Sequence, residues 1–526
     1  MENSKPFPGA AGRRRFTLLL VLLAVLAVSL HYCAWKSGMF IDEIYTYGLA
    51  NSHYMPFIGH GDHDRIQEQI ITREDFFDYL AVTDSEPGFD AGSVYYNQVQ
   101  DVHPPLYYWI LNFCSTLARG QFSKWIGLVP DLLIYLGLLA LLYALGMELF
   151  GDRLIAASVA ALYGFSQVGL STMLMIRMYV LMTLFTVLLA LLVARELRAP
   201  SGKREFGIGL TIFAGLMTQY YFVFYAFFLC ALTVTVLLCR GDRKPALRFS
   251  LSAFLGVGVM LLCFPAVFTQ MTGHRLGPES DALANLKNVS AWAGRLRYYF
   301  GQVRVGIPVA VLFAAVGLFI WLVLTLVRKE SRLTKADWRF LVLLIPVIPT
   351  VFVPAVISPV LEGRYIYNIM PVAVLAAGFC LLACSRHMDM RCAFGVILAF
   401  SFFWSLRTVP DYIYDEHPAY TAAVEAHADA PCLYLTEYYA GVTQDMLQLM
   451  AFDEVYVTGD PASEALETYL AQKDSGELVV YVDIDSMWGS GFAPGAMLDE
   501  LEKATGYAEA EHLYQYALSD TYLLRR

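Results

Sequence analysis

Long apolar segments separated by short polar stretches constrain this chain more than any other feature of its sequence. The first runs from Phe16 to Trp35, and at roughly 1.5 Å per residue a helix of this length crosses a bilayer. Hydrophobic residues make up 57% of the chain and charged residues 16%, which differs strongly from the composition of a soluble domain. The sequence therefore predicts a polytopic α-helical membrane protein.

About eleven segments are apolar and long enough to predict membrane-spanning helices. After the first, they cover roughly residues 126–149, 154–173, 178–197, 206–219, 220–239, 249–269, 306–327, 339–357, 368–384 and 392–406. The count depends most on the division at Gln219-Tyr220-Tyr221, because merging the two segments on either side would invert the orientation of everything that follows.

Basic residues mark one side of the predicted membrane. Arg13-Arg14-Arg15 precedes the first span, which we expect to be a retained anchor, and the positive-inside rule places this motif in the cytoplasm. The basic loops at residues 195–204, 240–248, 328–339 and 386–391 then fall on the same side. With an odd number of spans, residues 36–125 and the chain after about residue 407 lie outside the cytoplasm. We expect an integral protein of the plasma membrane.

The acidic residues that give the net charge of -10 are concentrated in two regions, roughly 36–105 and 407–526. This charge argues against a nucleic acid partner. In the second region, alternating patterns predict strands at 432–436 and 477–482, and helical patterns lie at 443–450 and 463–472. We expect residues 1–406 to form a transmembrane domain with an extracytoplasmic first loop (36–125), and residues 407–526 a small extracytoplasmic α/β domain.

Four polar motifs lie at or near the outer ends of apolar segments. They are Asp42-Glu43, the stretch from Asp101 to Tyr108, Arg177-Met178-Tyr179 and Glu362-Gly363-Arg364-Tyr365. Unpaired charge is costly at this depth, so these motifs indicate a functional site. A carboxylate can take a proton from a hydroxyl group, and arginine offers a planar fork to a phosphate. The pattern therefore indicates a site that binds an anionic headgroup and abstracts a proton.

The order of these motifs resembles the GT-C membrane glycosyltransferases. The elements are Phe40-x-Asp42-Glu43-x-x-Thr46 after the first helix, Asp101-x-His103-Pro104-Pro105-Leu106-Tyr107-Tyr108, then Arg177-Met178-Tyr179, and Gly363-Arg364-Tyr365 near the last spans. Within this superfamily the chain looks most like the protein O-mannosyltransferases and the lipid A aminoarabinose transferase. The likeness covers roughly residues 16–400, and residues 407–526 resemble no family that we can name.

The resemblance implies an enzyme that transfers a sugar from a polyprenyl-phosphate-linked donor to a lipid, glycan or protein acceptor on the outer face of the membrane. It implies that Asp42 is the general base and that Glu43 tunes its basicity or orients the acceptor. It also implies that Arg177 and Arg364, with the adjacent Tyr179 and Tyr365, bind the donor phosphate.

Asp101 and His103 are a candidate metal or acceptor site. Some members of the superfamily use a divalent metal near this element, and carboxylate and imidazole are suitable ligands. A local turn network before the Pro-Pro helix start explains the same two residues without a ligand. No cofactor is required by the sequence.

The other motifs also have structural explanations. Asp42 and Glu43 could cap the helix that follows, because acidic residues favour helix N-termini. Arg177 could extend to lipid headgroups. The stretch His60-Gly61-Asp62-His63-Asp64 looks like a metal loop, but a solvated polar loop is the favoured interpretation. The outer loop 270–305 could cover the donor or simply face the headgroups.

A lipid or oligosaccharide flippase is the alternative function. Transporters of this kind tend to have charges near mid-span and matched halves with broken helices. Here the charges gather at one membrane face and the halves do not match, so the sequence favours an enzyme. A scaffold that displays the C-terminal domain is a third class, and it would tolerate replacement of the outer carboxylates.

Overall fold

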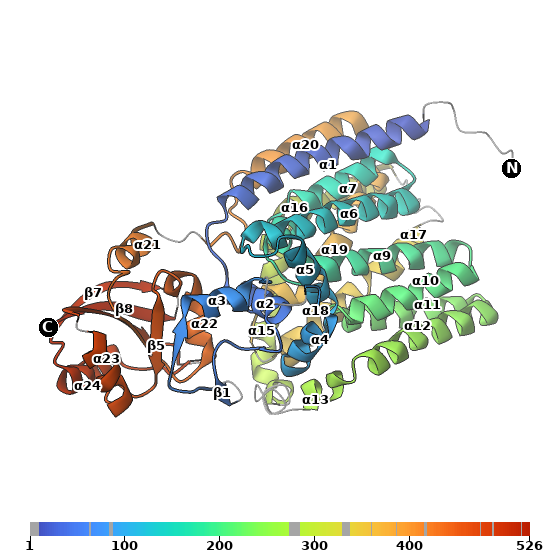
Figure 1. The fold of residues 1–526 in the computed structure, drawn as a ribbon. Coiled ribbons are helices and arrows are strands. Elements are labelled where there is room, and N and C mark those ends of the chain that lie inside the picture. The colour runs from blue at the N-terminus through green and yellow to red at the C-terminus, as the bar shows by residue number, and fades with distance from the viewer. Residues whose placement is uncertain are drawn as a thin grey trace. The chain divides into compact units, whose positions relative to one another are not determined.

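The computed structural model divides the chain into two compact units (Figure 1). The described residues are 10–62, 65–83, 88–272, 284–328, 337–358, 360–385, 387–414, 418–473, 475–486, 489–516 and 518–526. The first unit, here the helical unit, comprises Met1–Lys36, Val102–Tyr107 and Gly127–Ile413. The second, here the mixed unit, comprises Ser37–Asp101, Tyr108–Ile126 and Tyr414–Arg526.

Helices make up the helical unit. They are α1 (Ala10–Trp35), α6 (Lys124–Phe150), α7 (Arg153–Gly164), α8 (Gln167–Leu174), α9 (Tyr179–Arg198), α10 (Gly202–Leu216), α11 (Phe222–Cys239), α12 (Arg243–Cys263), α13 (Ala266–Thr272), α15 (Val289–Gly306), α16 (Pro308–Arg328), α17 (Asp337–Leu344), α18 (Val347–Ile357), the 3-10 helix η2 (Gly363–Ile369), α19 (Met370–Cys384) and α20 (Met390–Ser405). The first and last helices, α1 and α20, pack side by side (Figure 1).

Within the described residues, seven helices are long and apolar enough to cross a membrane, or nine if each of two bent helix pairs is one span. The expectation of about eleven spans is therefore not confirmed. The remaining two expected spans correspond to α10, with 15 residues, and α20, with 16. Both are shorter than the roughly 20 residues that usually cross the hydrocarbon core. α10 and α11 are nevertheless separate helices, divided near Gln219 as expected.

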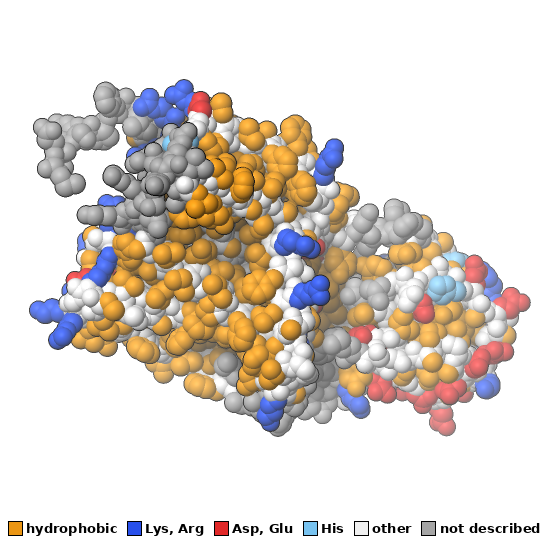
Figure 2. Space-filling view, turned by 180° about the vertical axis from the view of Figure 1, so that it is seen from behind, with side chains coloured by type: hydrophobic (Ala, Val, Ile, Leu, Met, Phe, Trp, Pro, Cys, Tyr) orange, Lys and Arg blue, Asp and Glu red, His pale blue; other side chains and the backbone are white. Residues whose placement is uncertain are grey.

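The surface of the helices is apolar where a membrane protein contacts lipid. Figure 2 shows hydrophobic side chains over most of the visible face of the helical unit, and Phe254 and Leu262 of α12 are 75% and 83% exposed. A soluble protein rarely exposes so large an apolar surface. The apolar helices and this surface together make the chain an integral membrane protein.

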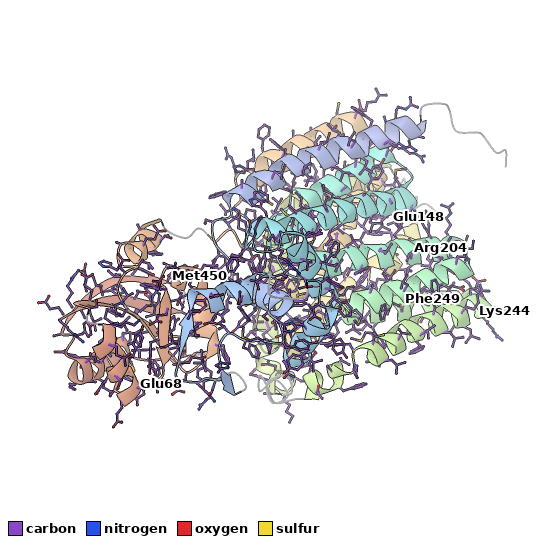
Figure 3. The ribbon with its side chains drawn as sticks, in the orientation of Figure 1. Glu68, Glu148, Arg204, Lys244, Phe249 and Met450 are labelled. Atoms are coloured by element: carbon purple, nitrogen blue, oxygen red, sulfur yellow. The ribbon has the colours of Figure 1, made fainter. Side chains whose placement is uncertain are left out.

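Ion pairs tie the helices together at one end of the helical unit, where Glu148, Arg204 and Lys244 lie (Figure 3). Glu148 accepts a hydrogen bond from Arg339 of α17 at 2.8 Å and contacts Arg198 of α9 at 3.1 Å. These are among the basic residues that the positive-inside rule assigned to the cytoplasm. Because they share this carboxylate partner, the helix ends meet without an unpaired buried charge at Glu148.

The mixed unit contains helices and a sheet. Its elements are α2 (Ile41–Asn51), β1 (Gly61–Asp62), β2 (Arg65–Ile66), β3 (Gln69–Thr72), α3 (Arg73–Leu80), α4 (Ala91–Gln100), α5 (Leu106–Leu117, from Tyr108 on), α21 (Pro418–Glu425), β4 (Cys432–Leu435), α22 (Tyr439–Leu449), β5 (Glu454–Thr458), α23 (Glu464–Lys473), β6 (Glu477–Asp483), α24 (Pro494–Thr505), β7 (Glu509–Tyr516) and β8 (Ser519–Arg525). β4, β6, α22 and α23 lie where the sequence patterns predicted strands and helices.

Six strands form one sheet in the order β3-β5-β4-β6-β8-β7. β4 runs parallel to β5 and β6, with Cys432 opposite Val455 on one side and Val479 on the other. The edge pairs β3-β5, β6-β8 and β8-β7 are antiparallel. One face carries an apolar core in which Leu433 and Val480 are fully buried.

The first loop supplies part of this sheet. β3 pairs with β5, and Tyr456 of β5 donates a hydrogen bond to Glu68, just before β3, at 2.9 Å (Figure 3). Pairing covers the β5 edge, which would otherwise expose unpaired backbone groups. The sequence-based division assigned residues 36–125 to the transmembrane domain, whereas the contacts group most of this loop with the C-terminal chain.

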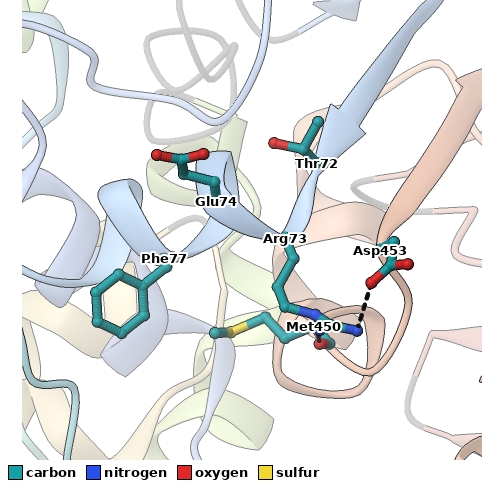
Figure 4. A pocket seen from close by; sticks show the side chains of 6 residues that line it. All are labelled: Thr72, Arg73, Glu74, Phe77, Met450 and Asp453. Atoms are coloured by element: carbon teal, nitrogen blue, oxygen red, sulfur yellow. Dashed lines mark hydrogen bonds and ion pairs between the residues drawn. The ribbon is translucent and has the colours of Figure 1, made fainter.

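Arg73 at the start of α3 strengthens this connection (Figure 4). Its guanidinium donates to the carbonyl oxygens of Met450 at 2.9 Å and Ala451 at 2.7 Å, and it pairs with Asp453 at 3.1 Å. It therefore caps the C-terminal end of α22, where unpaired carbonyl groups favour a cation. A pocket of about 470 Å³ lies beside it, lined also by Thr72, Glu74 and Phe77 (Figure 4).

Candidate functional site

The carboxylates of Asp42 and Glu43 lie in the first turn of α2, in the mixed unit. Phe40, the residue before the helix, has an extended backbone, and its N–H donates to Oε2 of Glu43 at 2.7 Å. Glu43 is fully buried. The structural explanation therefore holds for Glu43, which caps its own helix. Asp42 is partly exposed, and its main-chain carbonyl accepts a hydrogen bond from Thr46 Oγ1 at 2.6 Å.

Buried amide side chains hold the other end of α2. Asn112 donates to the carbonyl of Ala50 at 2.9 Å, and Asn97 donates to the carbonyl of Leu49 at 3.3 Å. These bonds replace the helix hydrogen bonds that the last carbonyl groups lack. α2 also packs against α3, α4 and α22. The helix that carries Asp42 is therefore fixed within its unit.

Asp101 and His103 fall in different units. Asp101 ends α4 in the mixed unit, where its N–H donates to the carbonyl of Asn97 at 3.0 Å. His103 belongs to the helical unit and is partly buried. Among the described residues, no three or more His, Cys, Asp or Glu side chains come together in an arrangement that could hold a metal ion. We therefore derive no step through a metal.

The chain around His103 is fixed by neighbouring helices. Leu106 donates its N–H to the carbonyl of Met217, at the end of α10, at 3.0 Å. The hydroxyl of Tyr107 contacts both carboxylate oxygens of the buried Asp131, at 2.9 and 3.0 Å. The Asp-x-His-Pro-Pro element thus leads into a well-held segment of the helical unit.

Arg177 lies in the short link between α8 and α9. The helix pair before this link is a broken span, in which α7 and α8 meet at an angle of 60°. Ser166 makes the break possible, since its Oγ accepts from Gly169 at 3.0 Å and caps α8. Arg177 is buried, with 5% of its surface exposed, and Tyr179 begins α9. Both α8 and α9 pack against η2.

Arg364 and Tyr365 lie on η2 itself. The ring of Tyr365 stacks on that of Tyr221, with centroids 4.4 Å apart and an interplanar angle of 8°. Nε of Arg364 lies 4.0 Å from a carboxylate oxygen of Glu362. Tyr365 also interacts electrostatically with Tyr179. The structure therefore brings Tyr179, Arg364 and Tyr365 together, as the motifs suggested.

Four tyrosines interact electrostatically with Arg364, and the sequence analysis selected only one of them, Tyr365. The four are Tyr221, Tyr298, Tyr365 and Tyr412. We call Arg364 and these four tyrosines the Arg364 cluster. Guanidinium and phenol groups are both hydrogen-bond donors to anions, and guanidinium suits a phosphate in particular. Tyr221 and Tyr298 lie in short runs of aromatic residues, and Tyr412 has no such signal in the sequence.

The sequence analysis also raised the loops 60–64 and 270–305 as candidate sites. In the described parts of both loops, local hydrogen bonds account for the polar residues. His63 and Asp64 of the 60–64 loop, and His274 and Arg275 of the 270–305 loop, lie outside the described residues. The N–H of His60 donates to Oε1 of Gln69 at 2.7 Å, and Gly61–Asp62 pairs with Arg65–Ile66. In the longer loop, Nε of Arg295 donates to the carbonyl of Ala355 at 2.6 Å and ties α15 to α18.

Residues 102–268 match the family model described as dolichyl-phosphate-mannose-protein mannosyltransferase. No curated protein sequence gives a significant match. The crystal structure of ArnT from Cupriavidus metallidurans bound to undecaprenyl phosphate aligns with a TM-score of 0.53 and 11% identity, covering 96% of this chain and 97% of that chain. The chain has the GT-C glycosyltransferase fold.

Two further structures agree with this fold. The apo state of ArnT from the same organism has a TM-score of 0.53 and 11% identity and covers 98% of both chains. The apo oligosaccharyltransferase from Archaeoglobus fulgidus has a TM-score of 0.50 and 11% identity, covering 96% of this chain and 74% of that chain. The residues matched by the mannosyltransferase family model include His103, Arg177 and Tyr179.

Proposed function

We propose that this GT-C glycosyltransferase takes a sugar from a polyprenyl-phosphate-linked donor and transfers it to an acceptor on the extracytoplasmic face of the plasma membrane. The observation that carries the proposal is the Arg364 cluster, in which an arginine side chain that is 12% exposed interacts electrostatically with four tyrosines. The ArnT structure with bound undecaprenyl phosphate supports a donor of this class. The acceptor would be a lipid, a glycan or a protein.

The helical unit would bind the donor phosphate. A polyprenyl phosphate leaves as an anion, so the reaction requires positive charge at the phosphate more than it requires an acid. Arg364 would supply a bidentate contact, and Arg177, in the link that packs beside η2, would supply a second charge. Removing one such stabilising group typically costs about 3 kcal/mol in the transition state. Tyr179 and Tyr365 would orient the arginines.

Asp42 would act as the general base. An acceptor hydroxyl is a poor nucleophile near neutral pH, and a positioned carboxylate accelerates its attack by about 10²–10⁴-fold. Glu43 is engaged as a helix cap, and Asp42 is the partly exposed carboxylate of this pair. Transfer in a single displacement would invert the anomeric centre of the sugar. Asp101 and His103 remain candidates for contacts with the acceptor.

The variant Asp42→Asn tests the role of the base. We expect transfer to fall by about 10²–10⁴-fold because the amide cannot take a proton, while binding of the lipid donor and expression stay close to those of the unchanged protein. The matched control is Asp75→Asn. Asp75 also lies in the first turn of a helix in the mixed unit, but its carboxylate accepts a hydrogen bond from the N–H of Thr72 at 2.8 Å and caps that helix. Equal transfer by Asp42→Asn and the unchanged protein would remove this role from Asp42.

A flippase remains the second candidate because two spans are broken, with bends of 60° and 89°. Discontinuous helices of this kind also line the substrate paths of transporters. The two functions differ in their products. In sealed proteoliposomes a flippase would move the intact polyprenyl-phosphate sugar across the bilayer, whereas the proposed enzyme would release the polyprenyl phosphate and glycosylate the acceptor.

A further inference from the structure

The helix α15 lies in a segment whose charges all have one sign. Between Ala284 and Arg328 every charged residue is basic, and the segment contains no aspartate or glutamate. The basic residues are Lys287, Arg295, Arg297, Arg304 and Arg328. The proposed donor site does not explain this pattern. The sequence analysis left open whether this loop covers the donor or faces the lipid headgroups, and the geometry of α15 favours the headgroups.

α15 runs nearly perpendicular to the helix that follows it. The bend between α15 and α16 is 89°. α16 has 21 residues, and its one charged residue is Arg328 at its end. A helix of about 20 apolar residues crosses a bilayer, so α15 runs along the membrane plane where α16 crosses it. α15 and Glu148 lie at opposite ends of the helical unit (Figures 1 and 3).

One face of α15 packs against α18. Nε of Arg295 donates to the carbonyl of Ala355 at 2.6 Å, and the ring of Trp292 meets the ring of Phe352 edge to face at 5.8 Å. Tyr299 is fully buried. Residues 292, 295 and 299 follow the three- and four-residue spacing of a single helix face. This face therefore fixes α15 to the helical unit.

The opposite face of α15 is exposed and combines arginine with apolar side chains. It carries Val289, Ala293, Arg297, Phe300 and Arg304, each three or four residues after the one before. Val289 is 63% exposed and Phe300 56%. Neither Arg297 nor Arg304 forms a hydrogen bond or an ion pair with a residue that the structure describes. The face therefore offers two guanidinium groups beside exposed apolar surface.

Such a face suits the boundary between lipid headgroups and acyl chains. An arginine at this depth extends its guanidinium to a phosphate, while its methylene groups and the neighbouring apolar side chains contact the acyl region. Basic residues at a membrane surface attract anionic lipids, and α15 has no acidic residue that would oppose this attraction. A free anion would gain nothing from the exposed Phe300 and Val289, so the pattern favours a lipid over a soluble ligand.

We propose that α15 is an interfacial helix whose Arg297 and Arg304 bind the phosphate groups of anionic phospholipids. The two residues are seven positions apart, which is about 10 Å along a helix, so each binds a separate headgroup. Val289 and Phe300 contact the acyl chains beside them. The inference is independent of the proposed function, since it concerns neither the sugar donor nor the acceptor.

The test measures phospholipid binding to the purified full-length protein by native mass spectrometry in detergent. The probes are dioctanoyl phosphatidylglycerol, which is anionic, and dioctanoyl phosphatidylcholine, which has the same chains and no net charge. We expect the unchanged protein to prefer phosphatidylglycerol. Arg297→Gln with Arg304→Gln should lower the affinity for phosphatidylglycerol about 5-fold at each of the two sites, because each site loses one basic residue. Binding of phosphatidylcholine should stay the same.

Two further double variants serve as controls. Arg297→Lys with Arg304→Lys keeps both charges and should retain most of the preference for phosphatidylglycerol. Arg65→Gln with Arg525→Gln removes the same charge from the mixed unit, where both arginines pair with carboxylates. This second variant should bind phosphatidylglycerol as the unchanged protein does.

Three results would overturn the inference. The first is an equal preference for phosphatidylglycerol in the unchanged protein and in Arg297→Gln with Arg304→Gln. The second is an equally large loss in Arg65→Gln with Arg525→Gln, which would assign the effect to net charge alone. The third is displacement of bound phosphatidylglycerol by inorganic phosphate, which would show that the face binds a free anion rather than a lipid.

Discussion

Glu43 and Asp42 are neighbours in the chain, but their side chains meet different surroundings. Glu43 is buried and accepts a hydrogen bond from the main chain of Phe40, whereas Asp42 is partly exposed. A cap stabilises a helix by about 0.5–2 kcal/mol, which is enough to fix the position of the adjacent side chain. At the scale of single residues, one carboxylate therefore supports the helix, and the other is the one we propose as the base.

The pair Glu43→Gln and Glu43→Ala tests this division of roles. Glutamine can accept the same hydrogen bond, so we expect Glu43→Gln to retain most of the transfer activity and thermal stability. Glu43→Ala should lose about 1 kcal/mol of unfolding free energy with the cap, and thermal melting of the purified protein measures this loss. A loss of transfer in Glu43→Gln as severe as that in Asp42→Asn would show that the charge of Glu43 takes part in the reaction.

Two substitutions at Arg364 distinguish a planar phosphate contact from simple charge. Arg364→Ala should weaken donor binding by about 100-fold, and Arg364→Lys by less, because lysine keeps the charge but loses the bidentate fork. Titration of the protein with undecaprenyl phosphate provides the comparison. Equal losses in the two variants would argue against bidentate recognition, and no loss in either would remove Arg364 from the site.

The sequence indicated Arg364 because an arginine between apolar segments is unusual, and the structure places Tyr365 and Tyr179 beside it. It could not indicate Tyr412, which lies 48 positions further along and interacts electrostatically with Arg364 in the folded chain. The sequence could not indicate Tyr221 and Tyr298 as site residues either. Their role depends on tertiary contacts, and tyrosines at helix ends are common in membrane proteins for reasons unrelated to catalysis.

At the scale of elements, α10 and α12 approach each other more closely than ordinary side chains allow. A Cβ atom on Gly256 would lie 2.3 Å from the carbonyl oxygen of Gly209, and one on Gly209 would lie 2.5 Å from the carbonyl oxygen of Ser252. Small residues allow such contacts between membrane helices, where backbone packing replaces the hydrophobic effect. The two helices therefore depend on glycine at these positions.

Valine substitutions on α12 test this contact. Gly256→Val should lower the stability of the protein by about 1–3 kcal/mol because α12 must move away from α10. Gly258→Val is the matched control, since a Cβ atom there would have no atom within 4 Å. The readout is the melting temperature in detergent. Similar melting temperatures for the two variants would contradict the close approach of the helices.

The helices were largely predictable from apolar composition, but the number of spans was not. Composition identified α10 and α20 as spans, although their lengths of 15 and 16 residues fall short of a usual crossing. The break between α7 and α8 was hidden, because capping by Ser166 leaves the hydropathy unchanged. Such local chemistry bends a span without interrupting its apolar pattern.

At the scale of the whole molecule, the chain assembles its mixed unit from distant segments. β3 is a run of four residues, Gln69–Thr72, in an otherwise irregular loop, and its partner β5 lies almost 400 positions away. No local pattern specifies such a pairing. The C-terminal chain therefore builds one unit with the helix that carries Asp42, since α22 packs directly against α2.

A cross-strand disulfide tests this assembly. Ile71 lies opposite Val455 in the β3-β5 ladder, and paired antiparallel residues are about 5 Å apart, within disulfide range. The double variant Ile71→Cys with Val455→Cys should form a disulfide on mild oxidation, and a protease cut between the two residues would then leave the fragments joined on a non-reducing gel. The control, Ile71→Cys with Leu478→Cys, places its partner on β6, which is not a neighbour of β3. Crosslinking in the control alone would contradict the ladder.

The most direct test of the account is sugar transfer by the purified protein. The protein in proteoliposomes would be incubated with polyprenyl-phosphate donors carrying different labelled sugars, together with a membrane extract as the source of acceptor. The account predicts that one donor is consumed and its label appears on an acceptor, and that Arg364→Ala and Asp42→Asn abolish the transfer. Intact donors after incubation with the unchanged protein, or equal consumption by both variants, would contradict it.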